Sequence, residues 1–197
     1  ARMARKGAIV KKLAAVETLG STTVIASDKT GTLTQNQMTA RAGWAGGRRF
    51  RAEGEGYGTA GRLMPDDPHG LLPPLLPYLR AGALCNDARL CDGDHDRVLV
   101  GDPTEGALRV LAEKAGALAD WPRVAELPFD SARKLMLTVH RHEGRLVLAA
   151  KGAPDVMAEY VTALRLPDGD RPLTATDRDM LRNEVERLGN RALRVLA

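Results

Sequence analysis

The sequence predicts an α/β (α+β) fold in which helices flank a mainly antiparallel, twisted sheet. Segments typical of short strands are joined by dipeptides that suit hairpin turns, Gly46-Gly47 and Glu143-Gly144. Stretches with helical spacing of apolar residues carry start signals, Asp102-Pro103 before one helix and Thr174 before another. With 197 residues, 44% of them apolar, the chain can bury a core of its own.

Periodicity and turn residues place the elements in chain order. The predicted strands are 23–26, 41–45, 48–52, 124–129, 134–140, 145–150 and 191–197. The predicted helices are the later part of 71–84, then 103–115, 153–160 and 176–188. Residues 98–100 fit a short strand or the approach to a helix, and the remaining segments are expected to be connectors, loops or turns: 1–22, 54–58, 65–68 and 91–95.

Composition excludes several classes of function. The net charge of +4 is a small surplus, so we expect no nucleic-acid partner. Cys85 and Cys91 are the only cysteines and lack the partners of a zinc site, and no histidine has a partner at metal spacing. No apolar run reaches the length of a membrane span. Basic residues crowd positions 2–12, which fits a solvated tail, a juxtamembrane stretch, or a non-enzymatic module that binds a membrane surface or nucleic acid.

The segment 27–34 reads Ser-Asp-Lys-Thr-Gly-Thr-Leu-Thr and directly follows the predicted strand 23–26. Asp28 therefore falls at the carboxyl end of a strand, where open α/β sheets place reacting groups. A carboxylate there can attack a phosphoryl group and carry it as an aspartyl-phosphate. Lys29 adds a positive charge, and the hydroxyls and flexible backbone of 30–32 suit phosphate oxygens. The alternative reading of the segment is a plain polar turn.

Four separate pieces of the later chain suit a nucleotide. Phe129, at a predicted strand end, could stack on a purine ring. Lys151 could reach a phosphate or the ring face, with Gly152 allowing close approach of the backbone. Arg194 could bridge phosphate oxygens, and Glu105 could accept a hydrogen bond from an amine or a ribose hydroxyl. Each residue alone is a weak signal, because a phenylalanine at a strand end is core in most proteins and a single surface lysine or arginine is usually only solvated.

Taken together, these motifs resemble those of P-type ATPases, the ion pumps that cycle through an aspartyl-phosphate. The segment 27–34 is similar to the family's phosphorylation signature. The segments 101–108, 128–136 and 151–155 resemble its three nucleotide-domain motifs in the family's order, and 193–197 resembles a later strand whose arginine contacts ATP. The pattern looks most like bacterial relatives of the calcium-pump branch.

The resemblance implies an ATP site, with Phe129 against the adenine. The implied site residues are Asp102, Glu105, Phe129, Lys134, Met136, Lys151, Gly152 and Arg194. Ser131 departs from the family, because animal calcium pumps have there an arginine that helps to hold phosphates. Arg133 could substitute for it in part.

The resemblance also implies that Asp28 attacks the γ-phosphorus of ATP in line. Lys29 and Thr30 would steady the phosphoryl oxygens, and Mg²⁺ would be held at Asp28 and Thr30. The main alternative is a soluble haloacid-dehalogenase-like phosphatase or phosphotransferase. Those enzymes carry a second aspartate two residues after the first, where this chain has Thr30, which supplies no general acid.

On this resemblance, 1–37 would be a juxtamembrane connector and the start of a haloacid-dehalogenase-like phosphorylation domain. Residues 38–197 would be most of a nucleotide-binding domain. The expected partners are ATP and the remaining phosphorylation, actuator and transmembrane domains of one pump. We expect a monomeric fragment, inactive by itself, from the cytoplasmic part of a membrane protein.

Overall fold

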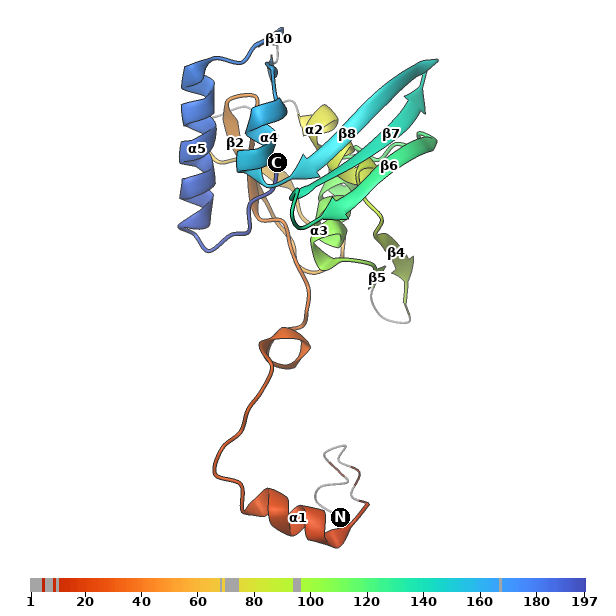
Figure 1. Ribbon diagram of the computed structural model, residues 1–197, viewed down its shortest axis with the longest axis vertical. Helices are drawn as coiled ribbons and strands as arrows, with labels where there is room; N and C mark the ends of the chain where they lie inside the picture. Colours follow the sequence, from red (N-terminus) through yellow and green to blue (C-terminus); the bar gives the residue numbers. More distant parts are fainter. Residues whose placement is uncertain are drawn as a thin grey trace. The chain divides into compact units, whose positions relative to one another are not determined.

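A computed structural model describes residues 5, 9, 11–67, 69, 75–93, 97–166 and 168–197 (Figure 1). The start of the predicted segment 71–84, much of the basic segment 2–12 and the end of the predicted turn 91–95 lie outside the described residues. The chain divides into two compact units, Ala1–Asn36 and Gln37–Ala197. Each unit is described by itself.

The first unit contains a helix, α1 (Leu13–Gly20), and a short irregular turn, η2 (Lys29–Leu33). The predicted strand 23–26 is wrong: this stretch is extended, with Val24 80% and Ile25 89% exposed. A strand forms when a neighbour bonds its backbone and covers its apolar side chains. Among the described residues no segment pairs with 23–26, so the apolar run has nothing to pack against.

The second unit opens with a three-stranded antiparallel sheet, β1-β2-β3. Its strands are β1 (Ala42–Ala45), β2 (Arg48–Ala52) and β3 (Leu63–Pro65). The predicted hairpin is confirmed, because Gly46 and Gly47 have φ of 55° and 76° and join β1 to β2. Both angles are positive, the conformation that a two-residue hairpin turn of this kind requires.

A second antiparallel sheet, β6-β7-β8, confirms the three later strand predictions with slightly longer bounds. Its strands are β6 (Arg123–Asp130), β7 (Leu135–His142) and β8 (Arg145–Gly152). The turn at Glu143 and Gly144, with φ of 48° and 75°, joins β7 to β8 as predicted. At the far end of the sheet Asp130, Leu135 and Gly152 are aligned across the three strands.

Four helices confirm the predicted ones. They are α2 (Leu75–Leu84), α3 (Pro103–Lys114), α4 (Pro154–Tyr160) and α5 (Ala175–Gly189). Asp102 caps α3 as predicted, and Thr174 opens α5 through a reciprocal capping box with Asp177. Within the described residues, no helix is long and apolar enough to cross a membrane.

The strand β3 was not predicted, and it includes Pro65 of the predicted loop 65–68. Two small ribbons were not predicted either: β4 (Arg89–Asp92) with β5 (Arg97–Val100), and β9 (Ala163–Leu166) with β10 (Gly169–Pro172). The polar turn predicted at 91–95 therefore overlaps β4 at Cys91 and Asp92. Of the two alternatives for 98–100, the strand is correct, because these residues lie in β5. The predicted strand 191–197 is wrong, since only Ala197 pairs, exchanging backbone bonds of 2.8 and 3.1 Å with Gly152. A single bonded pair does not make a ladder.

Two clusters of buried residues both include residues of α2. One joins β2, α2 and α3 through Phe50, Leu79 and Leu111. The other joins the end of α2 to β7 and β8 through Cys85 and Met136. Figure 1 shows α2 and α3 beside the β6-β7-β8 sheet. The first turn of α3 and the end of β8 are thereby brought close together.

Candidate functional site

The first turn of α3 is held by its cap. Asp102 Oδ1 accepts hydrogen bonds from the backbone N–H of Thr104 (2.8 Å) and of Glu105 (3.2 Å). Burial raises the pKa of the Asp102 carboxyl, but bonds from Thr104 and Glu105 and the charge of Arg194 outweigh it and lower the pKa. Asp102 thus fixes the position of Glu105, one turn into the helix.

Glu105 and Lys151 form an ion pair between α3 and β8. Lys151 Nζ donates to Glu105 Oε1, and the two side chains are only 12% and 14% exposed. The other carboxylate oxygen, Glu105 Oε2, accepts from the backbone N–H of Asp87 at 3.0 Å. The sequence predicts both charged residues as site residues, and the fold brings them into direct contact.

The surroundings of Lys151 are apolar. Met136 lies opposite Lys151 across β7 and β8 and is 1% exposed. Cys85 Sγ donates to the carbonyl of Met136 at 3.4 Å, and burial raises the pKa of the Cys85 thiol although Lys151 acts against it. Met136 therefore supports Lys151 from within the core and does not itself present a free surface.

Phe129 lies at the same end of the sheet as Lys151, next to the aligned row formed by Asp130, Leu135 and Gly152. Its side chain is 58% exposed. Asp130 Oδ1 orders the following turn by accepting from the backbone N–H of Ala132 (2.9 Å) and of Arg133 (3.0 Å). These bonds lower the pKa of Asp130. Phe129 therefore lies near the end of β6, as the sequence predicts, and it is exposed to solvent.

The turn closes on Lys134, which has a left-handed φ of 53° and donates its backbone N–H to Asp130 at 2.7 Å. Its carbonyl accepts from Ala153 at 3.0 Å. A Cβ on Gly152 would lie 2.5 Å from that carbonyl oxygen. The glycine is therefore needed for the close approach of two backbones beside Lys151.

Arg194 meets the first turn of α3 from the C-terminal segment. Its Nη1 lies 3.5 Å from Thr104 Oγ1, and its charge acts on Asp102. Direct contacts thus link Asp102 to Glu105 and Glu105 to Lys151, and Arg194 joins this group through Thr104. Phe129, Lys134 and Gly152 lie at the adjoining end of the sheet.

Asn86 holds the main chain of Glu105 and was not predicted as a site residue. Asn86 donates from Nδ2 to the carbonyls of Glu105 (2.8 Å) and Gly82 (3.2 Å), and accepts from Ala88 at 2.9 Å. Asn86 is only 6% exposed. Its place just after the last turn of α2 was visible in the sequence, but its partner 19 residues later was not.

Asp28, Lys29 and Thr30 belong to the first unit. Asp28 Oδ1 accepts from the backbone N–H of Thr30 at 3.3 Å, and all three residues are exposed. Among the residues that the structure describes, no cluster of three or more His, Cys, Asp or Glu could hold a metal ion. Asp28 and Thr30 offer oxygen ligands, which suit Mg²⁺, but two residues are too few for an all-protein site.

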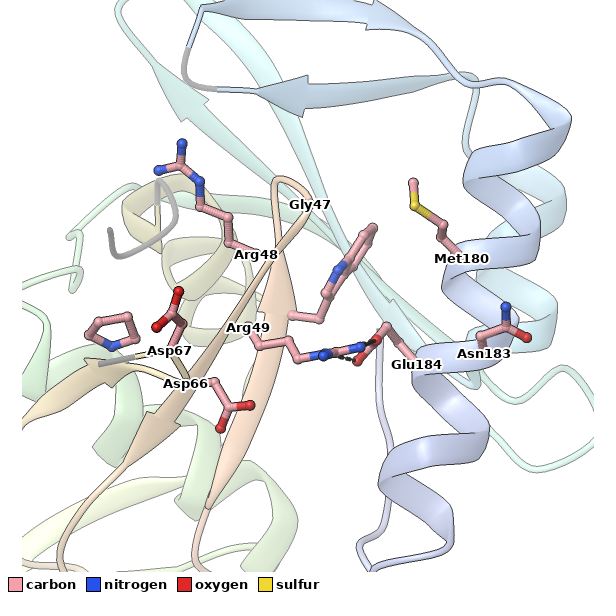
Figure 2. A pocket seen from close by; sticks show the side chains of 10 residues that line it. Gly47, Arg48, Arg49, Asp66, Asp67, Met180, Asn183 and Glu184 are labelled. Carbon is pink, nitrogen blue, oxygen red and sulfur yellow. Dashed lines mark hydrogen bonds and ion pairs between the residues drawn. The ribbon is translucent and has the colours of Figure 1, made fainter. Parts of the chain in front are cut away.

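A separate hollow of about 780 Å³ lies between the β1–β2 hairpin and α5 (Figure 2). Trp44 and Met180 line it, and Arg49 forms a two-pronged ion pair with Glu184 across it. That bond lowers the pKa of Glu184. None of the predicted site residues lines this hollow, so its size alone does not mark the site.

The segments of this chain that match known proteins include the predicted nucleotide-site residues 102–194. A family described as "P-type ATPase, cytoplasmic domain N" matches residues 75–197. The whole chain is 41% identical over 209 residues to the cation-transporting ATPase pma1 of Synechocystis and 39% over 206 residues to a calcium-transporting ATPase of Bacillus subtilis. It is 40% identical over 207 residues to the human calcium-transporting ATPase type 2C member 1. The chain spans 22–23% of the length of these relatives.

Proposed function

The chain belongs to the P-type cation ATPases and contains their cytoplasmic, nucleotide-binding domain N, and from this premise we propose that its nucleotide is ATP, held around the Glu105–Lys151 pair. The observation that carries the proposal is this pair itself. Two charged side chains are largely withdrawn from water, at the meeting point of a helix start and a sheet end. Such a pair gives little net stability. A role in binding explains it better than a role in folding.

The neighbouring residues supply what a nucleotide needs. The exposed ring of Phe129 offers a stacking surface for adenine. Lys151 has further N–H donors besides the one given to Glu105, and Arg194 brings a guanidinium to the first turn of α3. Together these cations offset the charge of the phosphates. Ser131 adds no charge, so the phosphates depend on Lys151, Arg194 and the nearby Lys134.

In the whole protein, we propose that this site delivers the γ-phosphate of ATP to Asp28. The carboxylate would attack the γ-phosphorus, the bond to the β,γ-bridging oxygen would break and ADP would leave, with Lys29 beside the carboxylate and Thr30 in place of a second acid. Bound Mg²⁺ would offset phosphate charge, with Asp28 and Thr30 among its ligands. Residues 1–37 would then be a juxtamembrane connector and the start of a haloacid-dehalogenase-like phosphorylation domain. The chain would be a cytoplasmic part of a membrane cation pump whose other domains lie outside it.

Titration calorimetry with ATP tests the site. Replacing Phe129 by Ala removes a stacking surface worth about 1–3 kcal/mol, so the Kd should rise roughly 5- to 150-fold. Lys11→Ala, a change in the first unit, is the control and should leave the Kd unchanged. Equal affinities of wild type and Phe129→Ala would contradict the proposal.

A further inference from the structure

The side chain of Arg123, the first residue of β6, is bonded on both of its terminal nitrogens. Nη1 donates to Asp87 Oδ1 at 2.6 Å and to Glu126 Oε2 at 2.8 Å. Nη2 donates to the main-chain carbonyls of Asn86 at 2.6 Å and Leu84 at 3.3 Å. One guanidinium therefore serves four acceptors: one in the last residue of α2, two in the segment that follows α2, and one in β6 itself.

The two hydrogen bonds to main-chain carbonyls contribute most to fixing the position of residues 84–87 relative to Arg123. Leu84 is the last residue of α2, and carbonyls at a helix end have no partner within the helix. The carboxylates of Asp87 and Glu126 are 58% and 46% exposed, so water screens their ion pairs with Arg123. The guanidinium acts mainly as a fork that fixes the main chain at 84–87. A lysine, with all its donors on one nitrogen, cannot reproduce that fork.

The same segment holds Glu105. The backbone N–H of Asp87 donates to Glu105 Oε2 at 3.0 Å, while the Asn86 side chain donates to the Glu105 carbonyl at 2.8 Å. Both the carboxylate and the main chain of Glu105 are thus bonded to the two residues that Arg123 holds. Arg123 also lies on β6, the strand that carries Phe129.

We propose that Arg123 is a positioning residue of the nucleotide site: it locks residues 84–87 to β6 so that the Asp87 amide fixes the Glu105 carboxylate against Lys151. This inference rests on the proposed function. It makes Arg123 the link between the strand that offers the stacking ring and the helix that offers the carboxylate. Arg123 itself does not touch the nucleotide.

The test compares ATP affinity in three variants by titration calorimetry. Arg123→Ala should raise the Kd about tenfold, within the range for coupled neighbouring residues. Arg123→Lys should lose most of the same affinity, because it keeps the charge but not the fork. Arg141→Ala, an exposed arginine on the adjacent strand β7, is the matched control and should bind as wild type does. Should Arg123→Ala fail to fold, Arg123→Lys carries the comparison.

A double-mutant cycle separates positioning from general loosening of the fold. In a Glu105→Ala background, Arg123→Ala should change the Kd less than twofold, because its effect passes through Glu105. In a Phe129→Ala background it should keep its full effect. An equal loss in both backgrounds would overturn the proposal.

The amide signal of Asp87 in ¹⁵N–¹H spectra, recorded without nucleotide, provides the second readout. It should shift in Arg123→Ala and Arg123→Lys and stay in place in Arg141→Ala; an unmoved signal in the first two would overturn the positioning role. If the wild type does not bind ATP, the proposed function is refuted. The shift of the Asp87 amide would still show whether Arg123 positions this residue.

Discussion

At the residue scale, Lys151 and Glu105 show a charge arrangement that folding alone does not require. Both side chains are mostly buried, above a core that includes Met136 and Cys85. Taking two charges out of water costs about as much as their attraction returns. The pair therefore contributes little net stability to the folded state.

The double variant Lys151→Met with Glu105→Gln tests this balance. Because both charges leave together, the free energy of unfolding should change by no more than about 1–2 kcal/mol. ATP affinity should fall roughly tenfold or more, since charged hydrogen bonds contribute about 1.5–3 kcal/mol. Urea unfolding and calorimetry measure the two quantities. A large loss of stability with unchanged ATP affinity would mean that the pair is structural.

Gly152→Ala tests the close approach of two backbones beside Lys151. The new Cβ would meet the Lys134 carbonyl at 2.5 Å, so the free energy of unfolding should fall by about 1–3 kcal/mol. Gly189→Ala is the control, because nothing lies within 4 Å of its Cβ position and it ends a helix. Urea unfolding of both variants checks the prediction. Equal stabilities would show that the strand end adjusts freely.

The sequence predicts the site residues that belong to recognisable motifs. It does not predict the residues that hydrogen-bond to them and fix their positions. Glu105, Phe129 and Lys151 belong to recognisable segments, and the fold puts each at the same end of the second unit. Arg123 and Asn86 have no such mark. Their importance comes from partners 37 and 19 residues away, and no local pattern reports a contact of that kind.

At the element scale, the start of α5 makes stability depend on pH. The Asp177 carboxylate accepts from Arg171 at 2.6 and 2.7 Å and from Thr174 in the capping box, and is 2% exposed. These bonds, that of Arg171 first, hold the pKa of Asp177 far below its ordinary value. The unfolded chain therefore binds this proton at higher pH than the folded chain does.

Stability from Asp177 is complete above the ordinary aspartate pKa of about 4 and is lost as the pH falls below it. Asp177→Asn should lower the urea midpoint at pH 7 and flatten its dependence on pH between about 4 and 2. Asp179→Asn, whose carboxylate is 61% exposed, is the control and should keep the wild-type slope. An unchanged slope in Asp177→Asn would contradict the assignment.

Elements with strong local signals were predictable, and those that depend on partners were not. The hairpin β7–β8 has alternating side chains and a turn with two positive φ values, and α3 has a cap and a first-turn proline. The ribbon β9–β10 is rich in charge and includes Pro172, so its sequence resembles a loop. Residues 23–26, by contrast, resemble a strand in sequence because they are apolar, but no segment within the described residues pairs with them.

At the scale of the whole molecule, the two units differ in how well their chain is protected. Residues 22–36 have exposed side chains and few backbone bonds, whereas Gln37–Ala197 contains the two sheets and both buried clusters. Brief trypsin digestion should therefore cut after Lys12 or Lys29 before it cuts within β6, β7 or β8. Mass spectrometry of the first products checks this order. Early cuts inside the second sheet would contradict it.

The second unit contains the residues that match domain N of the P-type ATPases, and the chain spans 22–23% of the length of its relatives. The proposal for this unit is that it holds ATP at one end of the β6-β7-β8 sheet. The contacts of the proposed site join α3, β8 and the C-terminal segment, so these three parts must fold together to form it.

Titrating the ¹⁵N-labelled chain with ATP and following its amide signals tests that claim most directly. The account predicts saturable shifts concentrated at Glu105, Phe129, Lys151 and Arg194, with small changes at Trp44 and Glu184 in the hollow between the hairpin and α5. Shifts centred on that hollow, or none at millimolar ATP, would contradict it.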